Sequence, residues 1–561
     1  MSLNLAIGSE HDRLSYAAKL HYLTGRTISL NITQAPNDVT ATELAAQVIL
    51  QRKGRVLDAL ADNLASLRQR LEPEGQALLD QLSAVTAEFA RVALHGEEYL
   101  SRDQFRAALD TLQRRQEALE TAISERSAGF YQEPRAITLA AVRAALPEDS
   151  ALLEYAVYHP VGIGLVTAAD APAHYAVYMI PSSGAVQVRD LGSAKDLEAL
   201  VEAFRRALRD PRADPTPEAK RLYTQVLQPL IAATATATAT AKRLIVSPDG
   251  ALNLVPFEAL MDEQGRYLVL QREISYVSSG RDLLRFAGKP AKTGPPAIVA
   301  DPDFGEPVAA AANAMRRGIE ARRSVTTAPD LASVFFASLS GTAREARDLK
   351  ALFPEAVLLT GSNASKANLK RLAAPKILHI ATHGFFLDHE ARASASSGAA
   401  ETRGIPATSA VENPLLRSGL ALAGANLSKD GSGEGILTAL EAANLNLWGT
   451  KLVTLSACDT GVGEIKNGEG VFGLRRAFVL AGAETLVMSL WPVSDSVTRQ
   501  LMGDYYRGLK EGLGRGAALR RAQVAMMLRT NRTHPFYWAS FIQAGNWASL
   551  ESVNERSNRV R

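Results

Sequence analysis

The sequence predicts an α/β protein whose C-terminal part is a mostly parallel sheet flanked by helices. Short, fully apolar segments of strand length alternate there with amphipathic helical segments, the pattern of strands buried on both faces. The expected strands lie at 297–300, 356–359, 377–380, 452–455, 485–490 and 540–543. The helical segments lie at 342–353, 469–481, 496–509 and 515–530.

The 561-residue chain is too long for a single hydrophobic core, so several domains are expected. Three regions differ in the secondary structure that their sequence patterns predict. Residues 1–150 are expected to be helical, because 41–70 has leucines at helical spacing and Ser101 stands three residues before Gln104, as in a capping box. Residues 151–292 form an α/β region with strands at 152–158, 162–167, 174–180 and 243–246 and a helix at 194–208. A Gly- and Pro-rich linker at 280–296 leads into residues 293–561.

Composition narrows the class of protein. A single cysteine excludes an intrachain disulfide framework and a zinc site built mainly of cysteines, and it suits a reducing compartment. The formal net charge is only +3, and the basic residues are scattered along the expected helices beside acidic ones. Both observations argue against nucleic-acid binding. No signal peptide and no apolar run of membrane-spanning length is visible. We therefore expect a cytoplasmic protein without a membrane contact, and we expect no cofactor.

The single cysteine and one histidine both follow expected strands. Cys458 ends an apolar segment and is followed by Asp459, Thr460 and Gly461. His383 ends another such segment and precedes Gly384. Because the carboxyl ends of neighbouring parallel strands meet at one edge of a sheet, the thiol and the imidazole are expected to lie side by side. A nucleophile with an acid/base partner is the pair that a cysteine protease needs.

Short blocks around these residues resemble the CHAT peptidases, bacterial relatives of caspases and separase in the group that also holds gingipains, legumains and metacaspases. The blocks are His379–Gly384, Ser418–Asn426, Gly435–Ala439, Leu455–Gly461, Gly468–Phe478 and Ser489–Val493. The likeness extends from about residue 150 to residue 548. A match over many blocks is specific, whereas His-Gly or Ala-Cys alone would indicate little.

The resemblance implies a role for each part of the chain. Residues 293–561 would be a caspase-like catalytic domain, with Cys458 as nucleophile, His383 as general acid/base, and the N–H groups of Gly384 and Cys458 as the oxyanion hole. Residues 151–292 would be a degenerate pseudo-caspase domain, since 247–249 reads Ser-Pro-Asp where an active copy has His-Gly, and no cysteine is present. Its expected role is to buttress the active half and to relay the signal of an activating protein partner.

Two acidic residues are candidates for the substrate pocket, and each has an alternative role. The segment that ends at Asp495 resembles the separase segment whose aspartate lines the pocket for a basic P1 side chain, so Asp495 is a candidate for binding Arg or Lys. Capping of the helix expected from Ser496 is an equal alternative. Asp459 is a second acid beside the cysteine, and stabilisation of a turn is its alternative role.

Two further histidines suggest another chemistry. His379 stands about 13 Å behind His383 on an extended strand, so a hydrogen-bonded core histidine is the favoured interpretation. A metal site from His379, His383 and His389 is disfavoured, because the four-residue spacing suits a helix and this segment is a strand.

The expected function is a cysteine endopeptidase that cleaves one or a few protein partners as a triggered effector. The resemblance implies this, since relatives act in antiviral defence or regulated cell death. The alternative is a catalytically inert protein-interaction scaffold on the same fold. Residues 388–412, rich in Ser, Ala and Gly, are expected to form a surface loop beside the site.

Overall fold

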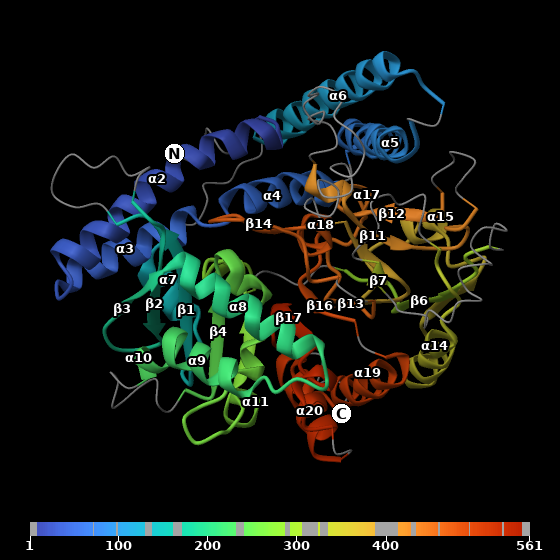
Figure 1. The fold of residues 1–561 in the computed structure, drawn as a ribbon. Helices are drawn as coiled ribbons and strands as arrows, with labels where there is room; N and C mark the ends of the chain where they lie inside the picture. Colours follow the sequence, from blue (N-terminus) through green and yellow to red (C-terminus); the bar gives the residue numbers. More distant parts are fainter. Residues whose placement is uncertain are drawn as a thin grey trace, which may run out of the picture.

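The computed structural model describes residues 8–70, 72–96, 99–128, 137–160, 171–231, 241–286, 292–305, 324–325, 335–387, 413–427, 434–457, 460–492, 494–529 and 532–551. One large sheet runs through the molecule, with helices on both of its sides and a helical region across one end (Figure 1). The expected segments 162–167 and 388–412 lie outside the described residues.

The large sheet has eleven strands in the order β3-β2-β1-β4-β5-β17-β16-β13-β9-β6-β8. The strands before the linker are β1 (Ser150–Tyr158), β2 (His174–Pro181), β3 (Gln187–Ser193), β4 (Arg243–Ser247) and β5 (Glu273–Tyr276). Those after it are β6 (Ala297–Pro302), β8 (Val357–Gly361), β9 (Ile377–Ala381), β13 (Leu452–Leu455), β16 (Thr485–Ser489) and β17 (Phe541–Gly545). The two groups meet where Tyr276 of β5 pairs with Ala544 of β17, so a single sheet spans both.

Most neighbouring strands of this sheet are parallel, which confirms the predicted sheet type. Antiparallel pairs occur between β1 and β2, between β2 and β3, and between β16 and β17. The other pairs, including β1 with β4, β4 with β5, β9 with β13 and β6 with β9, are parallel. Strands β9 and β13 are buried along their whole length, as their uninterrupted apolar sequences predict.

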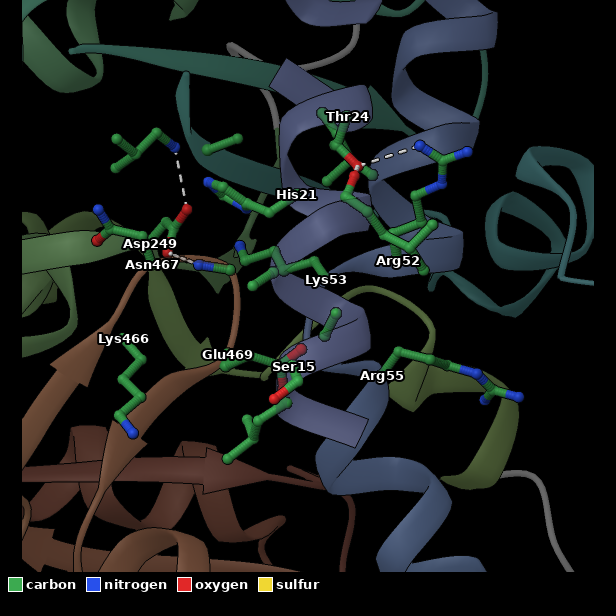
Figure 2. Close-up of a pocket in the computed structure, with 18 of the residues that line it drawn as sticks. Ser15, His21, Thr24, Arg52, Lys53, Arg55, Asp249, Lys466, Asn467 and Glu469 are labelled. Atoms are coloured by element: carbon green, nitrogen blue, oxygen red, sulfur yellow. Dashed lines mark hydrogen bonds between the residues drawn. The ribbon is translucent and has the colours of Figure 1, made fainter. Parts of the chain in front are cut away.

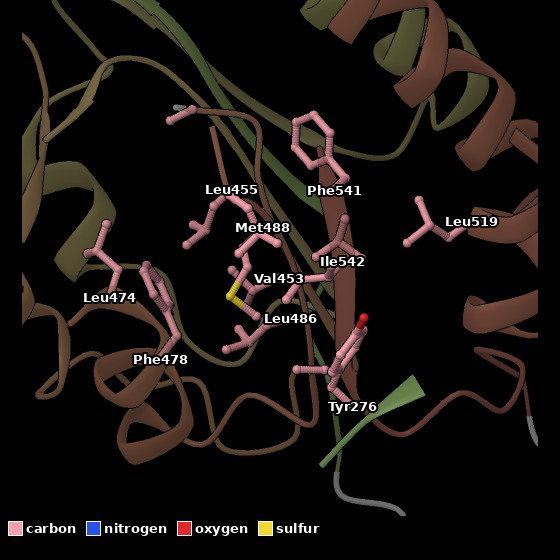
Figure 3. Close-up of a cluster of buried hydrophobic side chains, with 14 of the residues drawn as sticks. Tyr276, Val453, Leu455, Leu474, Phe478, Leu486, Met488, Leu519, Phe541 and Ile542 are labelled. Carbon is pink, nitrogen blue, oxygen red and sulfur yellow. The ribbon is translucent and has the colours of Figure 1, made fainter. Parts of the chain in front are cut away.

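Helices cover both faces of the C-terminal half. The helices that flank this half are α14 (Ser340–Leu352), α15 (Lys366–Lys370), α17 (Ala439–Ala442), α18 (Leu474–Ala481), α19 (Asp495–Lys510) and α20 (Arg515–Arg529). Figure 3 shows Leu474 and Phe478 of α18 on one side of the core strands and Leu519 of α20 on the other. Burial of apolar side chains on both faces stabilises this half by about 25 cal/mol for each Å² removed from water.

Helices also pack on the strands before the linker. These are α8 (Ala194–Arg209), α9 (Thr216–Val226), α10 (Gln228–Ile231), α11 (Leu268–Gln271) and α12 (Asp282–Phe286). Helix α8 was predicted at almost its observed bounds. The expected linker at 280–296 instead begins with α12, and residues 287–291 lie outside the described residues.

The N-terminal region is helical, as predicted. Its helices are α2 (Glu10–Gln34), α3 (Val39–Arg52), α4 (Arg55–Arg70), α5 (Pro73–His95), α6 (Arg102–Ala128) and α7 (Leu139–Ala145). The capping box at the start of α6 is present: the Ser101 N–H donates to Gln104 Oε1 over 3.0 Å and the Gln104 N–H donates to Ser101 Oγ over 3.4 Å. The helical stretch 41–70 is broken where Gly54 adopts a φ of 65° between α3 and α4.

Two small sheets were not predicted. Strands β12 (Ile436–Thr438), β11 (Ser418–Ala421), β10 (Gly384–Phe386) and β7 (Ser324–Val325) form one, in that order. Strands β14 (Glu464–Lys466) and β15 (Gly470–Phe472) form a hairpin. The helix expected at 469–481 therefore starts only at Leu474, because Gly468 and Gly470 adopt positive φ angles that form the turn and end of this hairpin.

Candidate active site

The two strands that carry the predicted catalytic pair are direct neighbours. Strands β9 and β13 are parallel and in register from Ile377 opposite Leu452 to Ile380 opposite Leu455. The Ser456 N–H extends this ladder by donating to the Ile380 carbonyl over 2.8 Å. The carboxyl ends of both strands therefore meet at one edge of the sheet, as the sequence predicts.

Cys458 and Asp459 lie outside the described residues, but the chain on either side of them is well anchored. Before the cysteine, the Ala457 carbonyl accepts a hydrogen bond from Ser489 Oγ at the end of β16. After it, Thr460 Oγ1 accepts from the Ser489 N–H over 3.1 Å, and the Gly461 N–H donates to the Ser489 carbonyl over 2.8 Å. The segment that bears Cys458 thus starts and ends against the carboxyl end of β16. The position of the thiol itself stays a prediction.

His383 follows β9 and its imidazole is oriented by a backbone carbonyl. Its Nε2 lies 2.7 Å from the carbonyl oxygen of Ala337, and its ring packs between Phe304 and Phe336 at centroid distances of 5.3 and 5.6 Å. Because a carbonyl only accepts, Nε2 carries the hydrogen of the neutral ring, and the basic lone pair lies on Nδ1. The residue is 2% exposed. This tautomer presents Nδ1 as the atom that is able to take a proton.

Gly384 opens strand β10 directly after the histidine. It is in register with Leu420 of β11 on one side and with Ser324 of β7 on the other. The neighbouring His383 carbonyl accepts a hydrogen bond from the Ala421 N–H over 3.0 Å, which ties the His-Gly peptide to β11. The contribution of the Gly384 N–H to an oxyanion hole stays a prediction.

His379 is a core histidine, which confirms the favoured interpretation. Its Nε2 lies 3.0 Å from Glu345 Oε1 of α14, and its Nδ1 lies 3.0 Å from the Tyr506 hydroxyl of α19. The side chains of His379 and Glu345 are each 1% exposed. Both ring nitrogens have partners inside the core, so this histidine is held away from the carboxyl edge of the sheet.

Sequence reasoning missed the role of Glu345 and Tyr506. Glu345 Oε1 also accepts a hydrogen bond from Ser456 Oγ over 2.7 Å, and the Tyr506 hydroxyl donates to Thr454 Oγ1 over 2.8 Å. Burial raises the pKa of Tyr506 well above its ordinary value, so the hydroxyl stays protonated and donates. The network fixes β13 up to two residues before Cys458. The one signal in the sequence was the position of Glu345 on the buried stripe of α14, beside Ala346 and Leu349.

Asp495, one of the two acids predicted for the substrate pocket, is the first residue of α19. Its Oδ2 accepts a hydrogen bond from the Gly341 N–H over 3.3 Å, in the first turn of α14. An acid at this position is favourable both for the N-terminus of α14 and for that of α19. Ser494 makes no side-chain cap bond. The pocket roles of Asp495 and Asp459 stay predictions.

The described residues show neither a metal cluster nor a helix suited to crossing a membrane. Within that part of the chain no group of three or more His, Cys, Asp or Glu side chains is arranged to hold a metal ion, and His389 lies outside it. None of its helices combines the length and the apolar character that crossing a bilayer requires.

The chain is an α/β protein whose mostly parallel sheet carries His383 and the segment containing Cys458 at the carboxyl ends of two neighbouring strands. The family model described as "CHAT domain" matches residues 216–546, more than half of the chain, and the chain belongs to this family. The matched part begins inside the region before the linker and ends at the end of β17.

Individual relatives are distant or cover little of the chain. Human tetratricopeptide repeat protein 28 is 33% identical over 117 residues, which is 21% of this chain and 5% of that protein. This chain thus spans about a twentieth of the curated relative. The complex of the Porphyromonas gingivalis RgpB pro- and mature domains is 10% identical with a TM-score of 0.33, covering 64% of this chain and 77% of that one. The Saccharomyces cerevisiae separase–securin complex is 10% identical with a TM-score of 0.36, covering 95% and 38%.

Proposed function

We propose that this protein is a cysteine endopeptidase with a Cys458–His383 dyad. The observation that carries the proposal is the register of β9 with β13, which brings His383 and the segment containing Cys458 to one edge of the sheet. The tautomer set by the Ala337 carbonyl adds to it, because Nδ1 of His383 is then free of hydrogen and able to accept the thiol proton. Membership of the CHAT domain family is the third support.

The proposed reaction uses these groups in sequence. His383 Nδ1 takes the proton of Cys458, and the thiolate attacks the carbonyl carbon of the scissile peptide bond. The N–H groups of Gly384 and Cys458 donate to the oxyanion, and one such donor is worth about 3 kcal/mol of barrier. The protonated imidazole then gives its proton to the leaving amine, and water releases the acyl group from Cys458.

The proposed substrates are one or a few protein partners, cleaved by a cytoplasmic effector that an activating protein partner triggers in defence or regulated cell death. Asp495 and Asp459 are the proposed acids of a pocket for a basic P1 residue. The continuous sheet supports the relay, because β5 of the degenerate region is hydrogen-bonded to β17 of the catalytic region. A signal received before the linker then reaches the active half through paired strands.

The test is covalent labelling of the purified chain with a peptidyl chloromethyl ketone that carries arginine at P1. In the wild type, the Cys458 thiolate is expected to displace chloride from the reagent and form one thioether. Mass spectrometry of the intact chain and its peptides detects the adduct. Cys458→Ala is expected to show no adduct, and His383→Ala a strongly slowed one. Labelling of the Cys458→Ala variant at the wild-type rate would contradict the assignment.

An inert interaction scaffold on the same fold is the second candidate. The burial of His383, at 2% exposure between two phenylalanine rings, favours it, because a substrate amide must reach the imidazole. A scaffold would leave Cys458 as reactive as a free thiol of the same exposure. His383→Ala would then leave the labelling rate unchanged, so the same experiment separates the two candidates.

A further inference from the structure

A cavity of about 400 Å³ lies at the carboxyl end of the degenerate region's strands, away from the proposed active site. Its lining comes from the last part of β1, from Asp249 just after β4, from helix α2, from the corner between α3 and α4, and from the turn of the β14–β15 hairpin. Figure 2 shows side chains from all these elements around it. In open α/β sheets this is the edge at which ligands bind.

The walls of the cavity combine apolar surface with several cations. Ala17 of α2, Ile49 of α3 and Val157 of β1 contribute to the apolar part. The cationic side chains in the lining are Arg52, Lys53, Arg55 and Lys466, and His11 and His21 are there as well. Asp249 and Glu469 are the acids in this lining. The volume falls within the range of about 300–1,000 Å³ that is usual for small-molecule pockets.

The two acids in the lining are outnumbered by its four cations. The carboxylate of Asp249 is already engaged by three backbone N–H groups, those of Val157 and Gly250 and that of Gly468, at 3.0, 2.9 and 2.8 Å. Burial raises the pKa of Glu469 to about 7, so much of this side chain is protonated near neutral pH. Asp249 therefore keeps its charge but is held by the backbone, and Glu469 supplies only part of a charge, so the two acids leave the four cations of the lining in excess.

Among the cations, Lys53 is already paired and Arg52 is not. Lys53 Nζ lies 3.2 Å from Glu154 Oε2 and donates to the Ser247 carbonyl. The Arg52 guanidinium contacts Thr24 Oγ1 over 3.4 Å and pairs with no carboxylate of the described residues. Burial lowers the pKa of both Arg52 and Lys466, and at Lys466 it outweighs the opposing effect of Glu10 and Glu469. The cavity thus has a net positive character beside an apolar wall.

We propose that this cavity binds a small organic anion, with an apolar body against α2, α3 and β1 and an acidic group at the Arg52 guanidinium. A charge-assisted hydrogen bond to that guanidinium relieves the unpaired cation, and the apolar wall gains from burial of the body. The proposal concerns a ligand site outside the Cys458–His383 pair and holds whether or not the protein is a peptidase.

The hairpin that closes one side of the cavity also belongs to the catalytic region. Strand β14 begins at Glu464, six positions after Cys458. The tip residue Gly468 is fixed between the other two regions: its carbonyl accepts from the Gly54 N–H over 2.6 Å and its N–H donates to Asp249 Oδ1. A ligand in the cavity therefore contacts the N-terminal helices, the degenerate half and the segment after the cysteine at once.

The test uses two fluorescent probes of the same aromatic body with the full-length chain. 8-Anilinonaphthalene-1-sulfonate carries an anionic group, and N-phenyl-1-naphthylamine lacks it. The proposal predicts saturable binding of the sulfonate. Arg52→Gln should weaken this binding about tenfold and Arg52→Lys should restore it, and neither variant should change the affinity for the neutral probe.

The matched control is Arg26→Gln. Arg26 is an exposed arginine on the outer side of α2, so this variant is expected to leave both affinities unchanged. Ala17→Phe, which fills the cavity, is expected to weaken both probes.

Hydrogen exchange locates the site independently of fluorescence. Bound sulfonate is expected to slow amide exchange several-fold in 466–470 and in α2 of the wild type, and not in Ala17→Phe. Equal sulfonate affinity in the wild type, Arg52→Gln and Ala17→Phe would overturn the proposal, as would protection confined to other parts of the chain. Binding of the neutral probe as tightly as of the sulfonate would also overturn the anion preference.

Discussion

The two carboxyl edges of the one sheet are built alike but end in different chemistry. In the C-terminal half, β9 is followed by His383, whose Nε2 lies 2.7 Å from the Ala337 carbonyl oxygen and so carries the hydrogen of the neutral ring. In the half before the linker, β4 is followed by Asp249, whose carboxylate accepts hydrogen bonds from three backbone N–H groups. The comparison teaches that equivalent strand ends can hold different groups: the proposed acid/base His383 in one half and, in the other, a carboxylate that binds backbone N–H groups of the fold.

The largest effect is expected from His383→Ala. Removal of the base leaves Cys458 with an ordinary thiol pKa of about 8.5, so only a few per cent is thiolate at pH 7 and ketone labelling should slow by about 30-fold. Peptide cleavage also loses the acid that protonates the leaving amine, so its rate should fall by about 10³-fold. Stopped-flow or quench measurements of the labelling rate provide the number. Asp249→Ala is the comparison variant and is expected to keep the reactivity of Cys458. An equally large loss of reactivity in folded Asp249→Ala would contradict the different roles assigned to the two strand ends.

The next effect concerns stability rather than chemistry. Asp249→Ala leaves the N–H groups of Val157, Gly250 and Gly468 without their acceptor, and should lower the free energy of unfolding by about 3 kcal/mol. Urea denaturation followed by circular dichroism measures this. Asp303→Ala is the control, because Asp303 is exposed and its carboxylate accepts a hydrogen bond from the Gly305 N–H over 3.1 Å. Its cost should stay below about 1 kcal/mol. Equal costs for the two variants would argue against Asp249 as a structural centre.

The hairpin tip offers a matched pair of glycines. Gly468 and Gly470 have φ angles of 76° and 85°, so alanine is strained at both. At Gly468 an added Cβ would also come within 2.8 Å of His21 Nδ1, whereas at Gly470 nothing lies within 4 Å. Gly468→Ala should therefore destabilise by about 2 kcal/mol and Gly470→Ala by about 1 kcal/mol. Thermal unfolding of both variants tests whether the hairpin is packed against α2; identical shifts would mean that it is not.

The smallest effect is a pH dependence. Burial raises the pKa of Glu469 to about 7, above its ordinary value of 4.5, so the folded state binds more protons than the unfolded state between these values. Stability contributed by this group is present at low pH and is lost as pH rises through about 7. Because the side chain is half-buried and screened, Glu469→Gln should make the protein more stable by only about 1 kcal/mol at pH 8 and by nothing at pH 4. Urea denaturation of both proteins at the two pH values measures this difference. A larger gain in the free energy of unfolding at pH 4 than at pH 8 would contradict a raised pKa for Glu469.

Much of the sheet could be predicted from sequence because its central strands are mostly apolar. The strand at 452–455 was predicted at its observed bounds, and 377–380 to within one residue. Strands β10, β11 and β12 were missed because three or four residues pair there across long sequence separations, without a local signal. The start of α18 was wrong because glycines near 468–473 favour a hairpin over a helix.

The candidate site was predicted in part. The positions of His383 and of the cysteine segment followed from strand ends, and the core role of His379 followed from strand spacing. Its partners Glu345 and Tyr506 were not predictable, because side chains on α14 and α19 meet only once both helices pack on the sheet. The Ala337 carbonyl beside His383 was missed for the same reason, since no residue type marks a backbone acceptor.

The pH dependence of Cys458 alkylation by iodoacetamide tests the dyad most directly. With His383 as its partner, the thiol should titrate well below the value of about 8.5 that is usual for a free cysteine, and His383→Ala should return it to that value. A wild-type profile with a midpoint at or above about 8.5, unchanged in His383→Ala, would contradict the proposed pairing of imidazole and thiol.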